Sequence, residues 1–206
     1  GEIEINDASA LWWLDGRPFR VGQLFNCYSG EALSVLAEKG ATHISLAAEV
    51  PAASIAVLAE TASDLGIGSE VQVFGRVSLA LSARCYHARA HDRTKDNCMF
   101  VCERDPDGLD LQTMGGGEYL AINGNQTLSY SYLNLCRELG ALVEMGVTHF
   151  RISPHSGDMV ATAGIFDRLV RGEIAAEEAD AVLTGLNAGV TFANGFMHGK
   201  PGYLRV

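Results

Sequence analysis

The sequence has no long apolar run and little positive charge. Its longest apolar stretches, such as residues 44–46 and 55–58, are far too short to cross a bilayer, so no transmembrane segment is expected. Fifteen Lys and Arg stand against 25 Asp and Glu, which gives a formal net charge of −10. General binding to nucleic acid or to an anionic membrane needs a net basic face, so neither partner is expected. A secretory signal is also lacking, because the chain opens without a basic region or a long apolar segment.

Cysteine is scarce and odd in number. Five cysteines fit poorly with a secreted disulfide framework, so we expect a protein of the reducing cytoplasm. Familiar catalytic motifs are missing as well. The sequence contains no Gly-x-Ser-x-Gly, His-Glu-x-x-His or Walker-type segment, which removes the commonest hydrolase and nucleotide-binding interpretations.

The cysteines that are present gather in one place. Cys85, Cys98 and Cys102 follow the spacing C-x12-C-x3-C inside a polar stretch. Basic and imidazole side chains are interleaved with them, namely Arg84, His87, Arg89, His91, Arg93 and Lys95. Buried free cysteines need apolar neighbours, and this stretch has few of them, so a shared ligand explains the clustering better than packing does. Thiolates select zinc, copper(I) or iron–sulfur clusters.

The spacing alone leaves the identity of the metal open. His87 or His91 could complete a zinc site with three cysteines and one histidine. An iron–sulfur cluster would instead need a fourth cysteine. Cys27 follows a strand-like run and Cys136 lies in a helical pattern, and isolated cysteines of this kind are usually buried in the core.

Two further polar segments follow predicted strands. Residues 123–129, Asn-Gly-Asn-Gln-Thr-Leu-Ser, form either a polar binding edge or, more simply, a turn at the Asn-Gly dipeptide. Residues 151–155, Arg-Ile-Ser-Pro-His, bring a cation, a hydroxyl and an imidazole to the end of a strand. Such a set can bind an anionic substrate.

Strand-like and helical patterns alternate along the chain, which predicts an α/β fold with a parallel sheet. Strands are expected at residues 2–6, 19–25, 43–47, 71–81, 119–122 and 148–152. Helices are expected at residues 31–39, from 51 onward, 133–145, 159–171 and 175–186, and residues 187–206 are expected to wrap the surface.

Six strands are too few for a complete (β/α)8 barrel, which usually needs about 250 residues. We therefore predict a single TIM-barrel-like domain over residues 1–206 that lacks roughly its first two βα units and forms the C-terminal portion of a longer protein. The long loop 83–118, which holds the cysteines, follows a strand. In barrels this is the side on which chemistry takes place.

Four segments resemble the UbiV-type proteins of the collagenase-like peptidase family U32, which act in oxygen-independent ubiquinone biosynthesis. The matching residues are 74–102, with the three clustered cysteines, 121–129, 146–154 and 194–202. The resemblance implies a barrel-like fold and a [4Fe–4S] cluster. Cys85, Cys98 and Cys102 match three of its four ligands, and the fourth lies in an N-terminal region that this chain does not contain.

The resemblance also implies partners and a reaction. A UbiU-type homologue would form a heterodimer with the chain, and the pair would hydroxylate the ubiquinone precursor ring without molecular oxygen. A lipid-carrier protein that presents the quinone precursor is a further expected partner. Arg84, His87 and Arg89 become candidate donors to the cluster or the substrate. No residue is assigned a catalytic role, and peptidase activity is not expected because no hydrolytic constellation is present. The alternatives are a zinc-binding barrel-like domain with a structural or assembly role, or a U32 peptidase.

Overall fold

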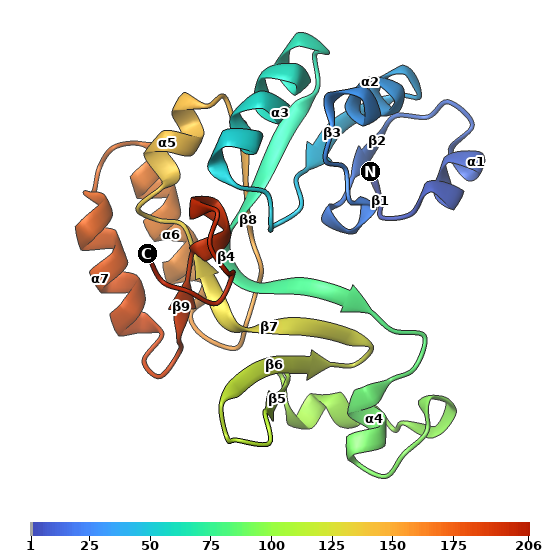
Figure 1. Cartoon of the computed structure of the whole chain (residues 1–206), viewed down its shortest axis with the longest axis vertical. Coiled ribbons are helices and arrows are strands. Elements are labelled where there is room, and N and C mark those ends of the chain that lie inside the picture. Colours follow the sequence, from blue (N-terminus) through green and yellow to red (C-terminus); the bar gives the residue numbers. More distant parts are fainter. Residues whose placement is uncertain (1) are drawn as a thin grey trace.

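The computed structural model describes residues 2–206, which form a mixed α/β fold around one curled sheet (Figure 1). The strands are β1 (Ile3–Ile5), β2 (Phe19–Val21), β3 (Ala41–Ser45), β4 (Gly68–Leu81), β5 (Leu109–Gln112), β6 (Glu118–Asn123), β7 (Gln126–Asn134), β8 (His149–Ile152) and β9 (Phe192–Ala193). The helices are α1 (Leu11–Leu14), α2 (Gly30–Glu38), α3 (Ala52–Asp64), α4 (Tyr86–Ala90), α5 (Leu139–Glu144), α6 (Met159–Val170) and α7 (Ala176–Leu186). In the described part of the chain, no helix has the length and apolar character that spanning a bilayer requires.

The first part of the sheet is parallel, as predicted. Strands β1, β2, β3 and β4 pair in sequence order, and β8 pairs with β4 on its other side. Helix α2 lies where the sequence predicts it: the Ser29 side chain accepts a hydrogen bond from the backbone N–H of Ala32 at its start. Gly40 follows its end with φ of +101°, a conformation that suits glycine.

The second part of the sheet is an antiparallel insertion that the sequence analysis did not predict. Strand β4 bends in its middle (Figure 1), and from Phe74 onward it pairs with β7; β7 in turn pairs with β6, and β6 with β5. Gly75 has φ of +97°, and a Cβ atom there would lie 2.3 Å from the carbonyl oxygen of Ser153. Only glycine fits this bend, because both its backbone conformation and the close approach exclude a side chain.

Two predicted elements are wrong in this region. The predicted helix 133–145 begins only at Leu139, because residues up to Asn134 belong to β7. The predicted loop 83–118 is not irregular throughout: it contains α4, the short 3₁₀ turns η3 (Lys95–Asn97) and η4 (Val101–Arg104), and β5. The turn predicted at Asn-Gly is confirmed, since Asn123 pairs with Gln126 across a tight β6–β7 hairpin.

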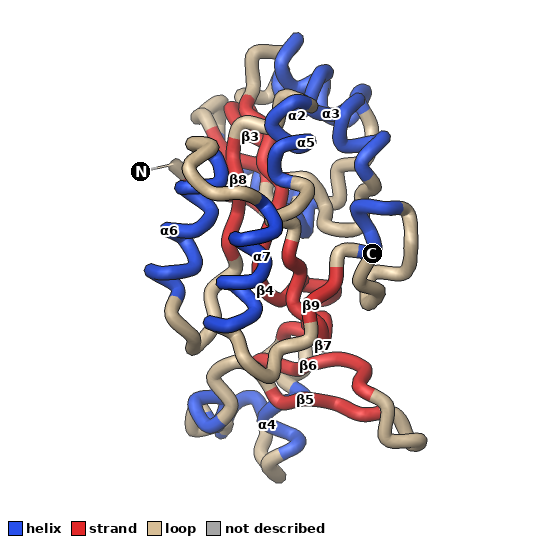
Figure 2. Tube along the Cα trace, turned by 90° about the vertical axis from the view of Figure 1, so that its left-hand side faces the viewer, coloured by secondary structure: helices blue, strands red, loops and turns tan. Residues whose placement is uncertain are grey.

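Helices cover the outer side of the curled sheet (Figure 1). Helices α2, α3, α5, α6 and α7 lie along the outer curve, where they bury the main apolar core with the sheet (Figure 1). Figure 2 shows that β5, β6 and α4 extend beyond this helical layer. The end of the sheet that β5 and β6 form is therefore less covered by helices than the rest.

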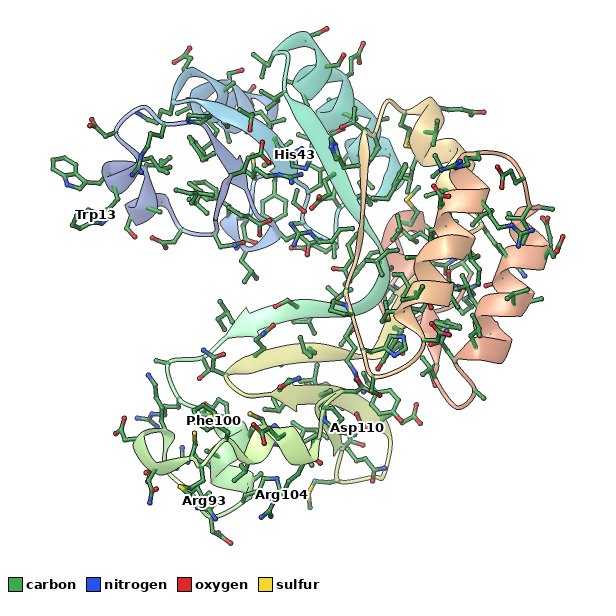
Figure 3. The ribbon with its side chains drawn as sticks, turned by 180° about the vertical axis from the view of Figure 1, so that it is seen from behind. Trp13, His43, Arg93, Phe100, Arg104 and Asp110 are labelled. Atoms are coloured by element: carbon green, nitrogen blue, oxygen red, sulfur yellow. The ribbon has the colours of Figure 1, made fainter. Side chains whose placement is uncertain are left out.

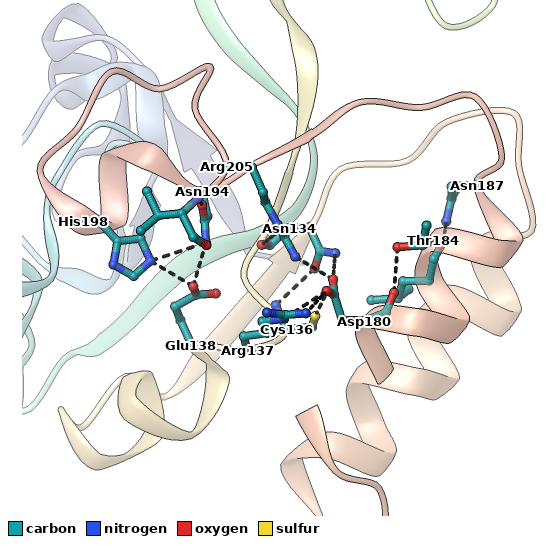
Figure 4. A network of polar contacts seen from close by, with 12 residues as sticks. Asn134, Cys136, Arg137, Glu138, Asp180, Thr184, Asn187, Asn194, His198 and Arg205 are labelled. Atoms are coloured by element: carbon teal, nitrogen blue, oxygen red, sulfur yellow. Dashed lines mark hydrogen bonds and ion pairs between the residues drawn. The ribbon is translucent and has the colours of Figure 1, made fainter. Parts of the chain in front are cut away.

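The prediction that residues 187–206 wrap the surface is correct for residues 198–206, which are mostly exposed, and wrong for residues 193–197, which join the core. Strand β9 pairs with β7, and Asn194, Gly195 and Met197 are buried. A Cβ atom on Gly195 would lie 2.0 Å from the carbonyl oxygen of Pro201, so the tail folds back tightly on itself. A network of polar contacts joins the tail to α7 and to the end of β7 (Figure 4).

Candidate functional site

The three clustered cysteines lie on one short segment at the carboxyl end of β4. We call residues 82–108 the cysteine arm; Phe100, Arg93 and Arg104 lie on it in Figure 3. Cys85 caps the start of α4, Cys98 ends η3 and Cys102 lies in η4, which contacts α4. All three are free thiols with partly exposed side chains. The arm therefore presents the predicted ligands from one compact segment.

The backbone of the arm directs hydrogen bonds to two of these sulfurs. The N–H of Ala88 donates to Cys85 Sγ and the N–H of Phe100 donates to Cys98 Sγ, each over 3.4 Å. Met99 and Phe100 both adopt φ of +52°, a left-handed conformation that is uncommon for residues other than glycine. Such outliers concentrate at functional sites. The turn after Cys98 brings the backbone N–H of Phe100 to the sulfur of Cys98.

The sulfur atoms are not gathered as a single zinc ion would need them. Tetrahedral zinc holds thiolates about 2.3 Å away, which places two sulfurs about 3.8 Å apart. Among residues 2–206, the one group of three or more ligand atoms that all lie within 4.8 Å of one another is His87, His91 and Asp105. Neither imidazole therefore joins the thiols, since both face the carboxylate of Asp105.

This histidine pair is tightly held. His87 is fully buried, and its Nε2 lies 2.8 Å from Asp105 Oδ2, while His91 Nε2 lies 3.2 Å from the same oxygen. The two rings stack with centroids 5.4 Å apart. Although partial burial opposes the shift, the hydrogen bonds with His91 and His87 lower the pKa of Asp105, so the carboxylate is ionised at neutral pH.

The remaining predicted residues of the region fall into two groups. The side chains of Arg84 and Arg89 are exposed on the arm, where they add positive charge near the thiols. Cys27 and Cys136 are buried in the core, as expected for isolated cysteines. Burial raises the pKa of Cys27, and burial together with the nearby Asp180 carboxylate raises the pKa of Cys136 to about 12.

A cleft of about 800 Å³ opens at the carboxyl ends of the parallel strands. Its walls come from the ends of β1, β2 and β3 and from the last residues of β4, and they include Ile5, Leu24, Ala48, Leu79, Leu81 and Phe196. Asn6, Asn26 and Glu49 add polar groups. Glu49 accepts a hydrogen bond from the hydroxyl of Tyr28, which raises the pKa of Tyr28 to about 12. The cleft is apolar along β4 and polar near Glu49.

A cluster of charged side chains that the sequence did not predict lies across the middle of these strands; we call Glu4, Arg20, His43, Glu70 and Arg151 the inner cluster. Glu70 of β4 is 7% exposed and accepts a hydrogen bond from Arg151 Nε over 2.5 Å. His43 of β3 and Arg20 of β2 lie 3.3 Å and 3.6 Å from its other oxygen. Arg151 also pairs with Glu4. The guanidinium that was expected to bind an anionic substrate is therefore occupied by two carboxylates of the chain itself.

His155, the second residue predicted for that site, lies against aromatic rings. Its ring centroid is 5.8 Å from that of Phe74 and 5.1 Å from that of Tyr132. Burial lowers the pKa of His155, and its Nε2 is buried and has no hydrogen-bond partner among residues 2–206. The residues 151–155 therefore split between a charged cluster and an aromatic pocket, and they do not form one anion site.

No solved structure matches the chain. The sequence model of peptidase family U32 matches residues 16–205, a range that includes the cysteine arm and most of the residues that line the cleft. The chain therefore belongs to peptidase family U32.

Proposed function

We propose that the chain binds a [4Fe–4S] cluster through Cys85, Cys98 and Cys102 and works as the iron–sulfur subunit of an oxygen-independent hydroxylase of the ubiquinone precursor ring. The observation that carries the proposal is the cysteine arm, which presents three free, partly exposed thiols on one segment. The fourth ligand is supplied from outside these 206 residues, as the resemblance to UbiV-type proteins implies. The partial sheet then corresponds to part of a TIM-type barrel.

The donor chemistry of the arm fits such a cluster. Thiolates are the usual ligands of iron–sulfur clusters, and hydrogen bonds to their sulfurs tune the potential. The N–H groups of Ala88 and Phe100 already point at two of the sulfurs. Arg84 and Arg89 provide positive charge that offsets the negative charge of a thiolate-bound cluster. When bound, the cluster would supply one-electron transfer.

The cleft fits an aromatic ring with an apolar tail. Its volume of about 800 Å³ lies in the range of small-molecule sites, which are mostly apolar with a few polar groups. Leu79 and Leu81 of β4 line it and remain exposed, at 45% and 57%. The cysteine arm follows directly after these residues, so a ring bound in the cleft would be held near the arm. The polar end at Glu49 would orient a ring oxygen.

Exposed apolar side chains on the arm support a protein partner. Tyr86, Met99 and Phe100 are 48%, 69% and 70% exposed, although they flank the thiols. Such groups are typical of interaction surfaces. We propose that a UbiU-type homologue covers them in a heterodimer, and that a lipid-carrier protein delivers the quinone precursor.

Replacing Cys98 tests the cluster assignment. The natural gene product, purified without oxygen together with its UbiU-type partner, should be brown and contain iron and acid-labile sulfide. Cys98→Ala should lower the iron and sulfide bound to this subunit about tenfold or more, because a cluster ligand is lost. The matched control is Cys27→Ala, which removes a buried thiol away from the arm and should leave both contents unchanged. Full iron and sulfide in Cys98→Ala would refute the assignment.

The family description supports a second candidate, a peptidase. This function predicts cleavage of a protein substrate such as denatured collagen, and that cleavage should be blocked by a metal chelator or a thiol reagent. A protein that holds an intact cluster and cleaves nothing would favour the hydroxylase. Zinc without sulfide would instead support the third candidate, a zinc-binding domain with a structural or assembly role.

A further inference from the structure

We propose that His87, His91 and Asp105 form a second metal site, separate from the cysteines, for one divalent transition-metal ion of the zinc type. The two histidines are four residues apart, on α4 and at its C-terminal end, so their rings stack on the same side. Asp105 follows η4 and places one carboxylate oxygen against both Nε2 atoms. Two imidazoles and one carboxylate are a common donor set for Zn²⁺ and Fe²⁺.

Both ring nitrogens of His87 lie against oxygen atoms. His87 Nδ1 lies 3.1 Å from the carbonyl oxygen of Ile122, which can only accept, so Nδ1 carries the hydrogen. Its Nε2 forms a hydrogen bond with a carboxylate oxygen of Asp105 that lies 2.8 Å away. A metal ion that displaces the hydrogen shared by these two atoms would bind both of them.

The same contact to Ile122 is the support that metal-binding histidines usually have. Such a histidine nearly always donates its other ring N–H to a carbonyl or a carboxylate, which fixes its orientation. Ile122 belongs to β6, so the ring is held by a strand and not only by its own short helix. The site is therefore positioned by three different elements, α4, η4 and β6.

The spacing of the ligands is close to what an ion needs. Zinc bonds of about 2.0–2.2 Å place tetrahedral ligands about 3.3–3.5 Å apart. The His91–Asp105 distance of 3.2 Å nearly meets this range, and the His87–Asp105 distance of 2.8 Å has to open by about half an ångström. Asp105 makes this movement feasible because its side chain is 26% exposed and lies at the end of a short turn. The exposed side leaves room for water as a fourth ligand.

The ion would tie the cysteine arm together. The backbone N–H of Asp105 donates to the carbonyl of Cys102 over 3.1 Å, and Cys85 begins the helix that carries the histidines. A metal at this point would therefore fix the relative positions of the segments that bear Cys85 and Cys102. This role does not depend on which cofactor the thiols bind.

Zinc binding to the full chain tests the site. After removal of metal with a chelator, the Cys85→Ser/Cys98→Ser/Cys102→Ser variant should still bind about one Zn²⁺ per chain, measured by dialysis and elemental analysis. Adding Asp105→Asn or His91→Gln to it should weaken this binding at least about 100-fold, because removing a ligand costs more than removing its supporting contact. His198→Gln, which changes a histidine outside the arm, is the matched control and should bind as before.

Two further readouts keep the test decisive if the triple variant folds poorly. In the otherwise unmodified chain, X-ray absorption at the zinc edge should show a nitrogen and oxygen shell at about 2.0–2.1 Å that Asp105→Asn removes, distinct from sulfur at about 2.3 Å. Co²⁺ bound at this site should give visible d–d bands that persist when the thiols are blocked. A shell of sulfur alone, cobalt bands lost with the thiols, or unchanged binding in Asp105→Asn would each overturn the proposal.

Discussion

Replacing Asp180 with alanine should lower the free energy of unfolding by about 2 kcal/mol, because it leaves the buried amide of Asn134 and the part-exposed guanidinium of Arg205 without their shared partner. Asp180 of α7 is 8% exposed. It accepts hydrogen bonds from Arg205 over 2.6 Å, from Arg137 over 2.9 Å and from the amide of Asn134 over 2.9 Å (Figure 4). Arg137 is half exposed and can return to water, so Arg205 and Asn134 account for most of the loss.

The loss should reach the C-terminal tail. Arg205 joins the tail both to Asp180 and to the carbonyl of Asn134, the last residue of β7. Without the carboxylate, the tail should detach from α7, and its backbone amides should exchange hydrogen faster. The N–H of Val206 donates to Asn194 over 2.7 Å in the native chain, and we expect this amide to lose protection first.

Urea unfolding at neutral pH measures the effect, and an exposed ion pair provides the control. Asp167 pairs with Arg171 over 3.1 Å on α6, with both side chains more than half exposed. Asp167→Ala should change stability by only about 0.5 kcal/mol or less. Equal losses for Asp180→Ala and Asp167→Ala, with unchanged urea dependence, would show that burial of the network contributes nothing.

The parallel half of the fold could be predicted because its signals are local. Ser29 and Gly40 bracket α2 with a cap and a left-handed glycine, and both features depend only on neighbouring residues. The strands before and after it are short apolar runs between turn residues. Each element there follows from a few consecutive side chains, so a single sequence was sufficient.

The antiparallel insertion could not be predicted, because distant pairing decides it. Leu133, Cys136, Leu139 and Leu142 are all buried and spaced by three, so they imitate one face of a helix. The first of them belongs to a strand because β7 pairs with β4, more than 50 residues away. The short strand β5 likewise exists only through its pairing with β6. Tertiary pairing overrides the local pattern in both places.

The candidate site also contains one part that could be predicted from the sequence and one part that could not. The spacing of three cysteines identified the arm, since metal-ligand patterns can be recognised along the chain. The inner cluster was missed because Arg20, Glu70 and Arg151 come from different strands and each looks like an isolated charge. Only the register of β2, β3, β4 and β8 brings them together. The polar residues inside otherwise apolar strands were the one available signal.

The inner cluster leads to a prediction for acid stability. Burial opposes ionisation of Glu70, but the hydrogen bonds with His43 and Arg151 outweigh it and lower its pKa to about 2, from an ordinary value of 4.5. The unfolded chain therefore binds a proton at a pH where the folded chain does not. The stabilisation from Glu70 is complete above about pH 4.5 and is lost as the pH falls to about 2.

The size of this effect follows from the shift. A change of one pKa unit corresponds to about 1.4 kcal/mol, so the ionised Glu70 contributes about 3 kcal/mol above pH 4.5. Glu70→Gln keeps the shape of the side chain and removes its charge. At pH 7 it should lower the free energy of unfolding by about 3 kcal/mol, because Arg151 then keeps only Glu4 as a charged partner and Arg20 keeps only Glu2.

The expected loss of stability in acid and the expected effect of Glu70→Gln can be tested together. If the stability of the native chain below pH 4.5 depends on Glu70, the curves of unfolding free energy against pH for the native chain and Glu70→Gln should converge as the pH approaches 2. Glu60→Gln changes an exposed carboxyl on α3 and should instead parallel the native chain throughout. Urea unfolding between pH 2 and 7 measures all three curves. If the free energies of unfolding of the native chain and of Glu70→Gln differed by the same amount at every pH, the substitution would act by disturbing packing. The charge of Glu70 would then not be what stabilises the inner cluster.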